Sequence, residues 1–485
     1  MHAISLYNSK SRRLEPLKPV SGSSVVFVYN CGPTVYKRQH IGNMRRFLNA
    51  DFLKRTLELF EYDVKDITNI TDVGHLTQDE IDEGEDKLEK EAKAQQKSPQ
   101  DIAEYQTKLF FQDIDTLNIE RSTQYPKATE HIEEMIDLIQ ILLDKKHAYI
   151  TESGIYFDIS TFPNYGKLSG NSITSIDAGH RVAVRSEKRN PEDFALWMFD
   201  SSHVQLWDSP WGKGYPGWHI ECSAMSMKYL GETIDIHTGG EDNRFPHHEN
   251  EIAQSEGATG KQFVNIWMHN RHLMLSGKKM AKREGETITL DTLKEKNYSP
   301  MAFRMLVFAH HYRSPIDFSW ELLDEFQGHV ESAKRLLERL PLNASSSEAV
   351  SEANRMLDNK IFGTVEEFKN ALMDDLNTSL AFSVFLQTTK KINVLLDGGN
   401  TDEAALRLTS LIAMNSVLGV LEPISQELEL NSTIPQEIID LSAQREQAKQ
   451  QKDYAKADML RDQIEQAGYT ISDTPNGPKM TRMSS

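Results

Sequence analysis

Two thiols, one imidazole and one carboxylate in this sequence have the chemistry of a metal site. The chain has two cysteines, Cys31 and Cys222, and the stretch FPHHENEIAQSE (residues 245–256) supplies His247 and Glu251. Together these four donors would make a tetrahedral zinc site. Their spacing is too dispersed for a zinc finger, so the folded core would have to assemble the site. The same residues also fit a plainer interpretation, in which Cys222 is a small buried hydrophobe and the stretch is an ordinary capped surface helix.

The spacing within this stretch favours a helix that presents two of the donors on one side. Pro246 suits the first turn of a helix, and acidic residues near its N-terminus complement the helix dipole. His247 and Glu251 are i and i+4, so they share one face. We expect His248 and Glu249 to point elsewhere.

Composition describes an ordinary globular chain with several cores. Its 485 residues suggest about three domains. Two cysteines in so long a chain exclude a disulfide framework and suit a reducing cytosol, and we expect a cytoplasmic protein. No apolar run approaches the roughly 20 residues that cross a bilayer, and the N-terminal residues lack a secretory pattern, so no membrane partner is expected. The net charge of −18 argues against a general nucleic-acid coat but leaves room for a local binding groove.

The elements that would position Cys31 follow a strand–helix–strand order. Ser24–Tyr29 is a β-branched and aromatic run typical of a buried strand, and the turn-prone residues 30–33 follow it. Apolar residues recur at helical spacing over His40–Phe60, and a second strand is expected over Val64–Ile70. This order predicts a parallel sheet with right-handed crossovers.

The remainder of the chain divides into a mixed region and a helical one. Residues 75–118 are very polar and favour a solvated helix, whereas residues 125–210 mix a helix with short strands and predict an inserted α/β subdomain. Strands are expected again at Thr233–His237 and Phe263–Met268. After about residue 300 the pattern is wholly helical, which predicts a bundle followed by a charged helical hairpin.

A series of motifs that covers nearly the whole chain resembles one known family. The motifs, in the family's order, are YNCGPTVY (29–36), HIGN (40–43), NITD (69–72), SPWGKGYPGWHIECSAM (209–225), HTGGEDNRFPHHENEIAQSE (237–256), KKMAKR (278–283), HYRSPIDFS (311–319), MDDLNTSLA (373–381) and DYAKADMLRDQI (453–464). They resemble cysteinyl-tRNA synthetase, a family of class I aminoacyl-tRNA synthetases. The long stretches around Cys222 and His247 are highly specific, whereas HIGN or KMAKR alone would be weak.

The resemblance implies an α/β fold with a Rossmann-type parallel-sheet catalytic domain, an inserted α/β subdomain, an all-α helical bundle and a small C-terminal domain. The boundaries expected from it are 1–124 for the first half of the catalytic domain, 125–210 for the connecting insertion, 211–325 for the second half with a KMSKS-like loop, 326–430 for a tRNA-contacting bundle and 431–485 for a C-terminal subdomain near the anticodon.

The resemblance also implies a reaction and its ligands. ATP, together with Mg²⁺, would activate L-cysteine to cysteinyl-adenylate, and tRNA(Cys) would then accept the cysteinyl group. One Zn²⁺ per chain would be held by Cys31, Cys222, His247 and Glu251, the set that the chemistry alone suggests. Because zinc prefers a thiolate to a hydroxyl, the metal itself would distinguish cysteine from serine. A monomer is expected rather than an oligomer.

By position, the nucleotide site would lie at HIGN and at the KKMAKR loop. Glycine leaves room for the nucleotide, and helix N-terminal amides favour phosphate. The ATP contacts implied are Gly32, Thr34, His40, Gly42, Asn43 and Lys282, and the catalytic residues are His40, Asn43, Lys279 and Lys282. Asn43 stands where the family's HIGH motif has a histidine, and Ala281 and Arg283 replace the serines of KMSKS.

Further positions gain roles only from the resemblance. Thr71 matches a substrate-pocket position, and Trp218 matches a tryptophan that closes over the substrate; a strand-end hydroxyl and a plain core residue are the simpler interpretations. In the tail, a basic face that contacts RNA is expected from Arg445, Lys449, Lys452, Lys456 and Arg461.

Two other functions fit many of the same residues. A ligase that joins cysteine to an amine would share the zinc site and both nucleotide motifs, but the long helical region after residue 325 argues against it. An inactive relative that binds tRNA or nucleotide would account for the altered KMAKR motif. The retention of His40, Lys282 and all four metal donors argues against an inactive protein.

Overall fold

In the computed structural model, four parallel strands form a sheet in the order β12-β11-β3-β4. Their bounds are β3 (Val25–Asn30), β4 (Asp63–Thr68), β11 (Ile234–Gly240) and β12 (Val264–Asn270). The strands expected from the sequence are therefore all present. β3 lies between β4, the next strand of its own half of the chain, and β11, which comes after the insertion. Ligands of open parallel sheets bind beyond the carboxyl ends of such central strands.

The structure describes residues 4–78, 83–170, 187–199, 203–275, 277–279, 287–340, 363–432, 435–451, 453–474 and 477–482. Among them, no single helix is long and apolar enough to cross a membrane. The pair Thr401–Leu418 and Leu421–Glu429 meets the length and composition test jointly, with a bend of 106° between its members.

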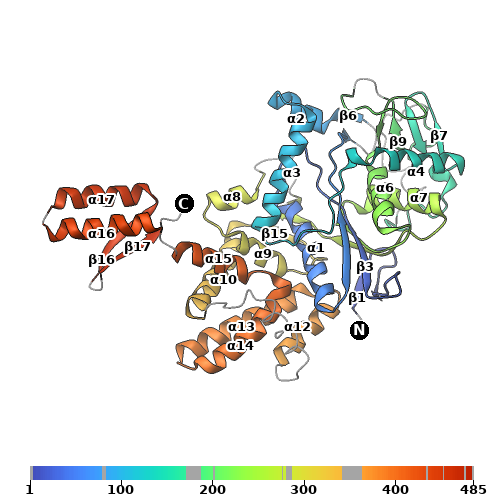
Figure 1. Cartoon of the computed structure of the whole chain (residues 1–485). Helices are drawn as coiled ribbons and strands as arrows, with labels where there is room; N and C mark the ends of the chain where they lie inside the picture. The colour runs from blue at the N-terminus through green and yellow to red at the C-terminus, as the bar shows by residue number, and fades with distance from the viewer. Residues whose placement is uncertain are drawn as a thin grey trace.

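Helices cover both faces of this sheet (Figure 1). α1 (Ile41–Leu59) connects β3 to β4 and packs in one apolar core with side chains such as Val26 and Ile236. α6 (Trp218–Leu230) precedes β11, and α7 (Glu249–Thr259) lies between β11 and β12; both pack in a second core. The N-terminal ends of α1, α6 and α7 thereby lie at the carboxyl edge of the sheet.

The inserted region builds an antiparallel sheet of its own, in the order β10-β9-β8-β7. Its elements are α4 (Ile132–Asp144), β7 (Ala148–Ile150), β8 (Gly154–Phe157), β9 (Phe194–Met198) and β10 (Tyr215–Pro216). α4 contacts α6 and α7, so the insertion rests on the helices that approach the carboxyl edge of β11.

The polar region that follows β4 is more than the single helix expected over residues 75–118. It begins with a hairpin, β5 (Leu76–Gln78) and β6 (Glu83–Asp86), and continues with α2 (Lys87–Gln95) and α3 (Pro99–Thr116). The Asp86 side chain caps α2, and Ser98 and Asp101 form a capping box at the start of α3. These caps explain why one polar stretch divides into two helices.

The expectation that the chain is wholly helical after residue 300 is wrong at two places. A small sheet in the order β14-β13-β15 combines β13 (Leu273–Leu275), β14 (Lys278–Lys279) and β15 (Ile316–Phe318), around the short helices α8 (Leu290–Glu295) and α9 (Pro300–Phe308). The second exception is the C-terminal hairpin, β16 (Tyr469–Thr474) and β17 (Gly477–Arg482). β15 is so short that its parallel pairing with β13, far back in the chain, determines its conformation.

The helical region and the tail follow the predicted pattern. The bundle contains α10 (Trp320–Arg339), α12 (Gly363–Met373), α13 (Thr378–Asp397), α14 (Thr401–Leu418) and α15 (Leu421–Ser432). The tail forms the hairpin of α16 (Gln436–Gln450) and α17 (Tyr454–Gln466), which stands apart from the bundle in Figure 1. Arg445 is buried in this tail, so it does not belong to a solvent-facing basic face.

Candidate metal centre and active site

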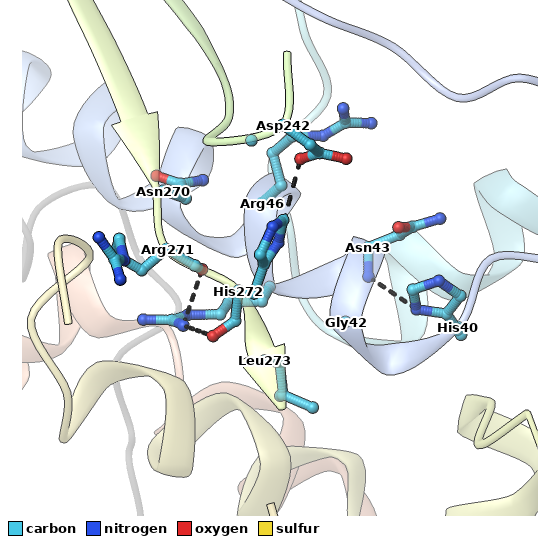
Figure 2. Close-up of a pocket in the computed structure, with 11 residues that line it drawn as sticks. His40, Gly42, Asn43, Arg46, Asp242, Asn270, Arg271, His272 and Leu273 are labelled. Carbon is cyan, nitrogen blue, oxygen red and sulfur yellow. Dashed lines mark hydrogen bonds and ion pairs between the residues drawn. The ribbon is translucent and has the colours of Figure 1, made fainter. Parts of the chain in front are cut away.

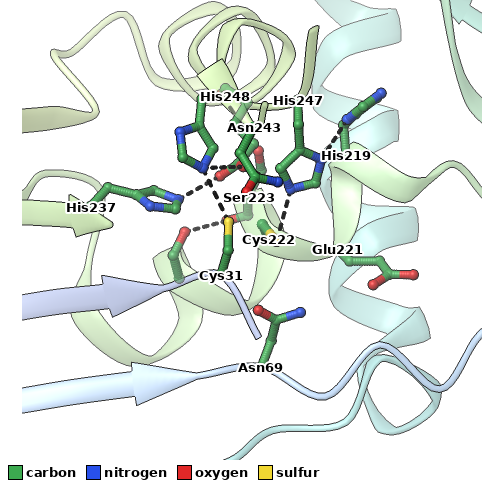
Figure 3. A network of polar contacts seen from close by, with 12 residues as sticks. Cys31, Asn69, His219, Glu221, Cys222, Ser223, His237, Asn243, His247 and His248 are labelled. Atoms are coloured by element: carbon green, nitrogen blue, oxygen red, sulfur yellow. Dashed lines mark hydrogen bonds and ion pairs between the residues drawn. The ribbon is translucent and has the colours of Figure 1, made fainter. Parts of the chain in front are cut away.

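The four predicted metal donors meet at the carboxyl edge of β3. Figure 3 labels three of them, Cys31, Cys222 and His247. Cys31 directly follows β3, Cys222 lies on α6, Glu251 lies in the first turn of α7, and His247 lies in a π-helical turn, η4 (Arg244–His248). One donor atom from each of these four residues lies within 4.8 Å of the others, and all four side chains are buried. Residues from opposite halves of the sequence therefore converge on one point.

Contacts inside this cluster show a site that a cation would complete. His247 Nε2 lies 3.5 Å from Cys222 Sγ and 3.1 Å from Glu251 Oε1. Although His247 Nε2 lies this close, the geometry is not that of a hydrogen bond, and the fully buried Glu251 Oε1 accepts none from the described residues. A buried carboxylate oxygen without a donor is costly, and a divalent cation would compensate it. The residues present therefore fit a bound metal ion.

The pKa directions at the cluster lead to the same conclusion. Burial lowers the pKa of the His247 imidazole well below its usual value, which leaves its ring nitrogen neutral and able to ligate. A hydrogen bond with Cys31 raises the pKa of the Cys222 thiol well above its usual value, and burial is the second largest cause of this rise. Burial also raises the pKa of Glu251. Anionic donors are thus unfavourable here on their own, and a cation reverses that preference.

His248 also faces the cluster, so the expectation that it points elsewhere is wrong. Its Nε2 lies 3.1 Å from Cys31 Sγ. The regular helix α7 begins only at Glu249, and Phe245 inside η4 has extended backbone angles of −143° and 133°. The α-helical spacing that separates adjacent side chains therefore does not apply before α7. Together with His237, Cys31 and Glu251, His248 forms a second, overlapping set of four donors.

Further histidines surround the donors and hold them in place. His219 Nδ1 lies 2.7 Å from His247 Nδ1, His237 Nε2 lies 2.9 Å from Glu251 Oε2, and His269 Nε2 lies 2.9 Å from His248 Nδ1. Such outer hydrogen bonds orient metal ligands. The sequence carried a signal for His269, because it lies near the carboxyl end of β12, whereas His237 lies in the middle of β11.

The two predicted substrate residues lie beside the metal donors. Trp218 starts α6, and its ring centroid is 4.3 Å from that of His247. Thr71 follows β4, and its hydroxyl donates a 2.9 Å hydrogen bond to Glu221, the neighbour of Cys222. Glu221 also lies 2.5 Å from His75 Nε2. Sequence reasoning did not single out Glu221 or His75.

A basic pocket adjoins the start of α1 (Figure 2). His40 is the N-cap of α1, and its Nδ1 accepts a 3.1 Å hydrogen bond from the Asn43 amide. The lining residues are His40, Gly42, Asn43, Arg45, Arg46, Gly240, Asp242, Asn270, Arg271, His272 and Leu273. A helix N-terminus beside several arginines suits a phosphate-bearing ligand. Three of the predicted ATP residues thus line one pocket, and Arg46 and His272 line it with them.

Arg45 has a different role from Arg46, although both line this pocket. The guanidinium of Arg45 donates to the carbonyl oxygens of Arg271 and His272, each at 2.8 Å. Burial lowers the pKa of Arg45 to about 10. Arg46 instead donates to Gly32 O at 3.1 Å, which ties the pocket to the loop that carries Cys31.

Gly32 and Thr34 do not line this pocket, and their ATP contacts stay predictions. Gly32 is required for a close approach of two chain segments, because a Cβ there would lie 1.5 Å from Asn69 O. The Lys279 backbone pairs with Met274 in β13. The Lys279 side chain and all of Lys282 lie outside the described residues, as do Ala281 and Arg283.

Comparison with known proteins places the chain in a family. Residues 17–328 match the family of class I (C) tRNA synthetase catalytic domains, and residues 367–422 match the DALR domain family. Because the first match spans the central sheet, the metal donors and the basic pocket, the chain is a class I aminoacyl-tRNA synthetase by fold and sequence.

Curated relatives define the family more narrowly. The chain is 41% identical to the cysteine–tRNA ligase of Chlorobium chlorochromatii, with 98% of each chain covered. It is 42% identical to that of Treponema denticola, with 97% of this chain and 98% of the relative covered. The protein belongs to the cysteine–tRNA ligase family.

Solved structures show the same fold at much lower identity. Mycobacterium tuberculosis methionyl-tRNA synthetase bound by methionyl-adenylate has a TM-score of 0.56 and 13% identity, with 84% of this chain and 89% of that chain covered. The LeuRS of Agrobacterium radiobacter K84, in a ternary complex with tRNA and LeuAMS, has a TM-score of 0.56 and 12% identity, with 85% of each chain covered.

Proposed function

We propose that this protein is a cysteine–tRNA ligase, which activates L-cysteine with ATP and transfers it to tRNA(Cys). The observation that carries the proposal is the buried cluster of Cys31, Cys222, His247 and Glu251 beside the basic pocket at the start of α1. A thiol-selective centre next to a phosphate-binding helix end suits the formation of an adenylate from cysteine.

The metal centre would hold one zinc ion through Cys31, Cys222, His247 and Glu251. When bound, zinc supplies a soft cation that prefers the thiolate of cysteine to the hydroxyl of serine. The protein presents its donors from a strand end, a π-helical turn and two helices, so the fold brings them together without a ligand. His219 contacts the His247 ring and His237 contacts the Glu251 carboxylate, so these two histidines orient both ligands. Trp218, whose ring centroid is 4.3 Å from that of His247, would close over the bound amino acid.

Hydrogen-bond donors and cationic side chains of the protein would bind the phosphates of ATP. The α1 N-terminus, with His40, Gly42 and Asn43, would bind ATP phosphates that Mg²⁺ accompanies, together with Gly32 and Thr34. Lys279 and Lys282 would stabilise the charge that develops on the phosphates as the cysteine carboxylate attacks the α-phosphorus. Positioning and charge stabilisation are the main requirements of such a transfer.

The remaining assignments follow from family membership. We infer that residues 1–124 and 211–325 form the catalytic domain, 125–210 the connecting insertion, 326–430 a tRNA-contacting bundle and 431–485 a subdomain near the anticodon. The DALR match over residues 367–422 supports the assignment of the bundle. A monomer in the cytoplasm is part of the same proposal.

The test is cysteine-dependent ATP–pyrophosphate exchange, followed by charging of tRNA(Cys), by pure zinc-loaded protein. Exchange with cysteine and not with serine, together with charging of the tRNA, supports the proposal. Transfer of cysteine to a small amino-sugar and not to tRNA would identify the amine ligase instead. Absence of exchange would identify an inactive relative.

A further inference from the structure

A small cavity lies where the catalytic region meets the helical bundle. Asn49 and Leu53 of α1 line it, together with Tyr312 and the turn between α12 and α13. The volume open to the centre of a water-sized sphere is about 10 Å³, which is about the space that one water molecule needs. Asn270 lines both this cavity and the basic pocket at the start of α1, so the two spaces are neighbours.

Asn49 is the residue of this cavity whose hydrogen bonding is incomplete. It is only 8% exposed, and among the described residues neither its amide oxygen nor its amide nitrogen has a hydrogen-bond partner. Two unpaired polar atoms in the interior are costly, because each loses its contacts with water and gains none in return. Because Asn49 lines the cavity, an occupant of the cavity can supply the missing partner.

Three hydroxyl groups of residues that line the cavity donate their hydrogen atoms elsewhere. The Thr238 hydroxyl donates to Asn30 at 2.6 Å, the Tyr312 hydroxyl donates to Asp375 at 2.6 Å, and the Thr378 hydroxyl donates to a backbone carbonyl oxygen at 2.8 Å. A hydroxyl has one hydrogen, so these oxygens can only accept from an occupant, and the occupant must donate. Among the described residues that line the cavity none is acidic, so a divalent cation would lack the carboxylate ligands that it prefers.

We propose that this cavity holds one ordered water molecule, which hydrogen-bonds to the Asn49 amide and to a hydroxyl of the lining and thereby joins α1 to the bundle. Water is the smallest occupant that both donates and accepts, and a buried water makes about three hydrogen bonds. This structural role is independent of the proposed ligase activity.

The turn between α12 and α13 is the part of the bundle that the water would support. Asp375 and Leu376 have left-handed backbone conformations there, with φ angles of 54° and 50°, and neither residue is a glycine. Such conformations persist only where surrounding contacts hold them. Tyr312 holds Asp375 and lines the cavity, and Leu376 lines it as well. The water would complete the contacts between this turn and α1.

A crystal structure of the full-length protein tests the presence of the water. We expect one density peak within about 3.2 Å of an Asn49 amide atom and of at least one of the three hydroxyl oxygens. Asn49→Leu nearly conserves the volume of the side chain and removes both polar atoms, so the peak should be absent from this variant. Asn370→Leu, the same substitution on an exposed residue of α12, should keep the peak.

Hydrogen exchange followed by mass spectrometry tests the role of the water at the turn. In Asn49→Leu the backbone amides of residues 373–380 should exchange roughly fivefold faster or more, because a contact that holds the turn is lost. The amides of α17, in the separate tail, should exchange at the same rate as in the unaltered protein.

Three results would overturn the inference. An empty cavity in the unaltered protein would show that the Asn49 amide has no partner, and this result does not depend on whether any variant folds. A peak with several oxygen neighbours at about 2.4 Å would identify a metal cation instead of water. Unchanged exchange of the turn in Asn49→Leu, with the water lost, would show that the water does not join α1 to the bundle.

Discussion

Cys222 contributes a sulfur atom to the cluster of metal donors from the buried side of α6, 3.5 Å from His247 Nε2. We expect Cys222→Ser to lose stoichiometric zinc and cysteine activation together, because a hydroxyl is a poor zinc ligand in place of a thiolate. Elemental analysis and cysteine-dependent pyrophosphate exchange on the same preparation measure both losses.

Met225→Leu is the matched control for this variant. Met225 is buried on the same helix, and the substitution nearly conserves volume, so zinc and exchange activity should be retained. Full zinc occupancy in Cys222→Ser would show that Cys222 is not a ligand and would leave the overlapping set of Cys31, His237, His248 and Glu251 as the binding site.

Lys282 is the cation that the resemblance assigns to the transition state. Lys282→Ala should keep zinc and cysteine binding but slow activation by roughly a hundredfold or more, because a charged contact is lost only where charge develops. Cysteine-dependent ATP–pyrophosphate exchange measures this step. Lys261→Ala, which removes an exposed lysine paired with Glu232, is the control, and a normal rate in Lys282→Ala would remove Lys282 from the mechanism.

The sequence predicted part of this site, for reasons that are visible in single residues. The i, i+4 spacing of His247 and Glu251 and the strand before Cys31 are local patterns, and the structure brings these donors together. His248 was misjudged because its orientation depends on a π-helical turn. Glu221 was missed because its role depends on where β4 and α6 meet, which no local pattern encodes.

At the scale of elements, the turn between α12 and α13 holds three parts of the molecule together. Asp375 accepts hydrogen bonds from the Tyr312 hydroxyl and Arg313 Nε, each at 2.6 Å, and from the Tyr7 amide at 2.7 Å. Tyr7 lies in β1 (Ser5–Asn8), and Tyr312 and Arg313 precede β15. The bundle is thereby anchored to the segment that leads into β15.

We expect Asp375→Asn to lower the free energy of unfolding by about 2–4 kcal/mol, because an amide in this place leaves the Arg313 charge and one buried donor poorly matched. Urea denaturation followed by circular dichroism measures the change. Asp374→Asn changes the adjacent exposed carboxylate and should have almost no effect. Similar losses in both variants would contradict the anchoring role of Asp375.

Elements whose own periodicity is strong were predicted well, and short elements were not. α1 and α4 follow helical apolar spacing, α7 has acidic residues in its first turn, and β3 is a β-branched and aromatic run. β15 and the β5–β6 hairpin are strands of three or four residues that depend on partners elsewhere. Such pairing is a tertiary effect, which overrides local preference.

At the scale of the whole molecule, the tail formed by α16, α17, β16 and β17 has an apolar core of its own. Its buried side chains are Ile438, Ile464, Tyr469 and Ile471, and they belong to neither of the two large cores around the sheet. This tail is connected to the bundle mainly through α15.

A chain of residues 1–432 should therefore fold and keep pyrophosphate exchange within about twofold of the full chain. It should lose roughly tenfold or more in kcat/KM for tRNA charging, because removing contacts to a large polyanion weakens its binding. The two assays on matched preparations of both chains measure these effects. Unchanged charging of tRNA would show that the tail takes no part in recognition.

The two buried cysteines have a practical consequence for anyone who purifies this protein. Cys31 is 5% exposed and Cys222 is 2% exposed, and they are the chain's entire complement of thiols. A colorimetric thiol reagent should react with almost nothing in the loaded enzyme and with two groups per chain after chelation and denaturation. Counting them by Ellman titration would give the fraction of thiols in a preparation that are still reduced, without any label or engineered reporter.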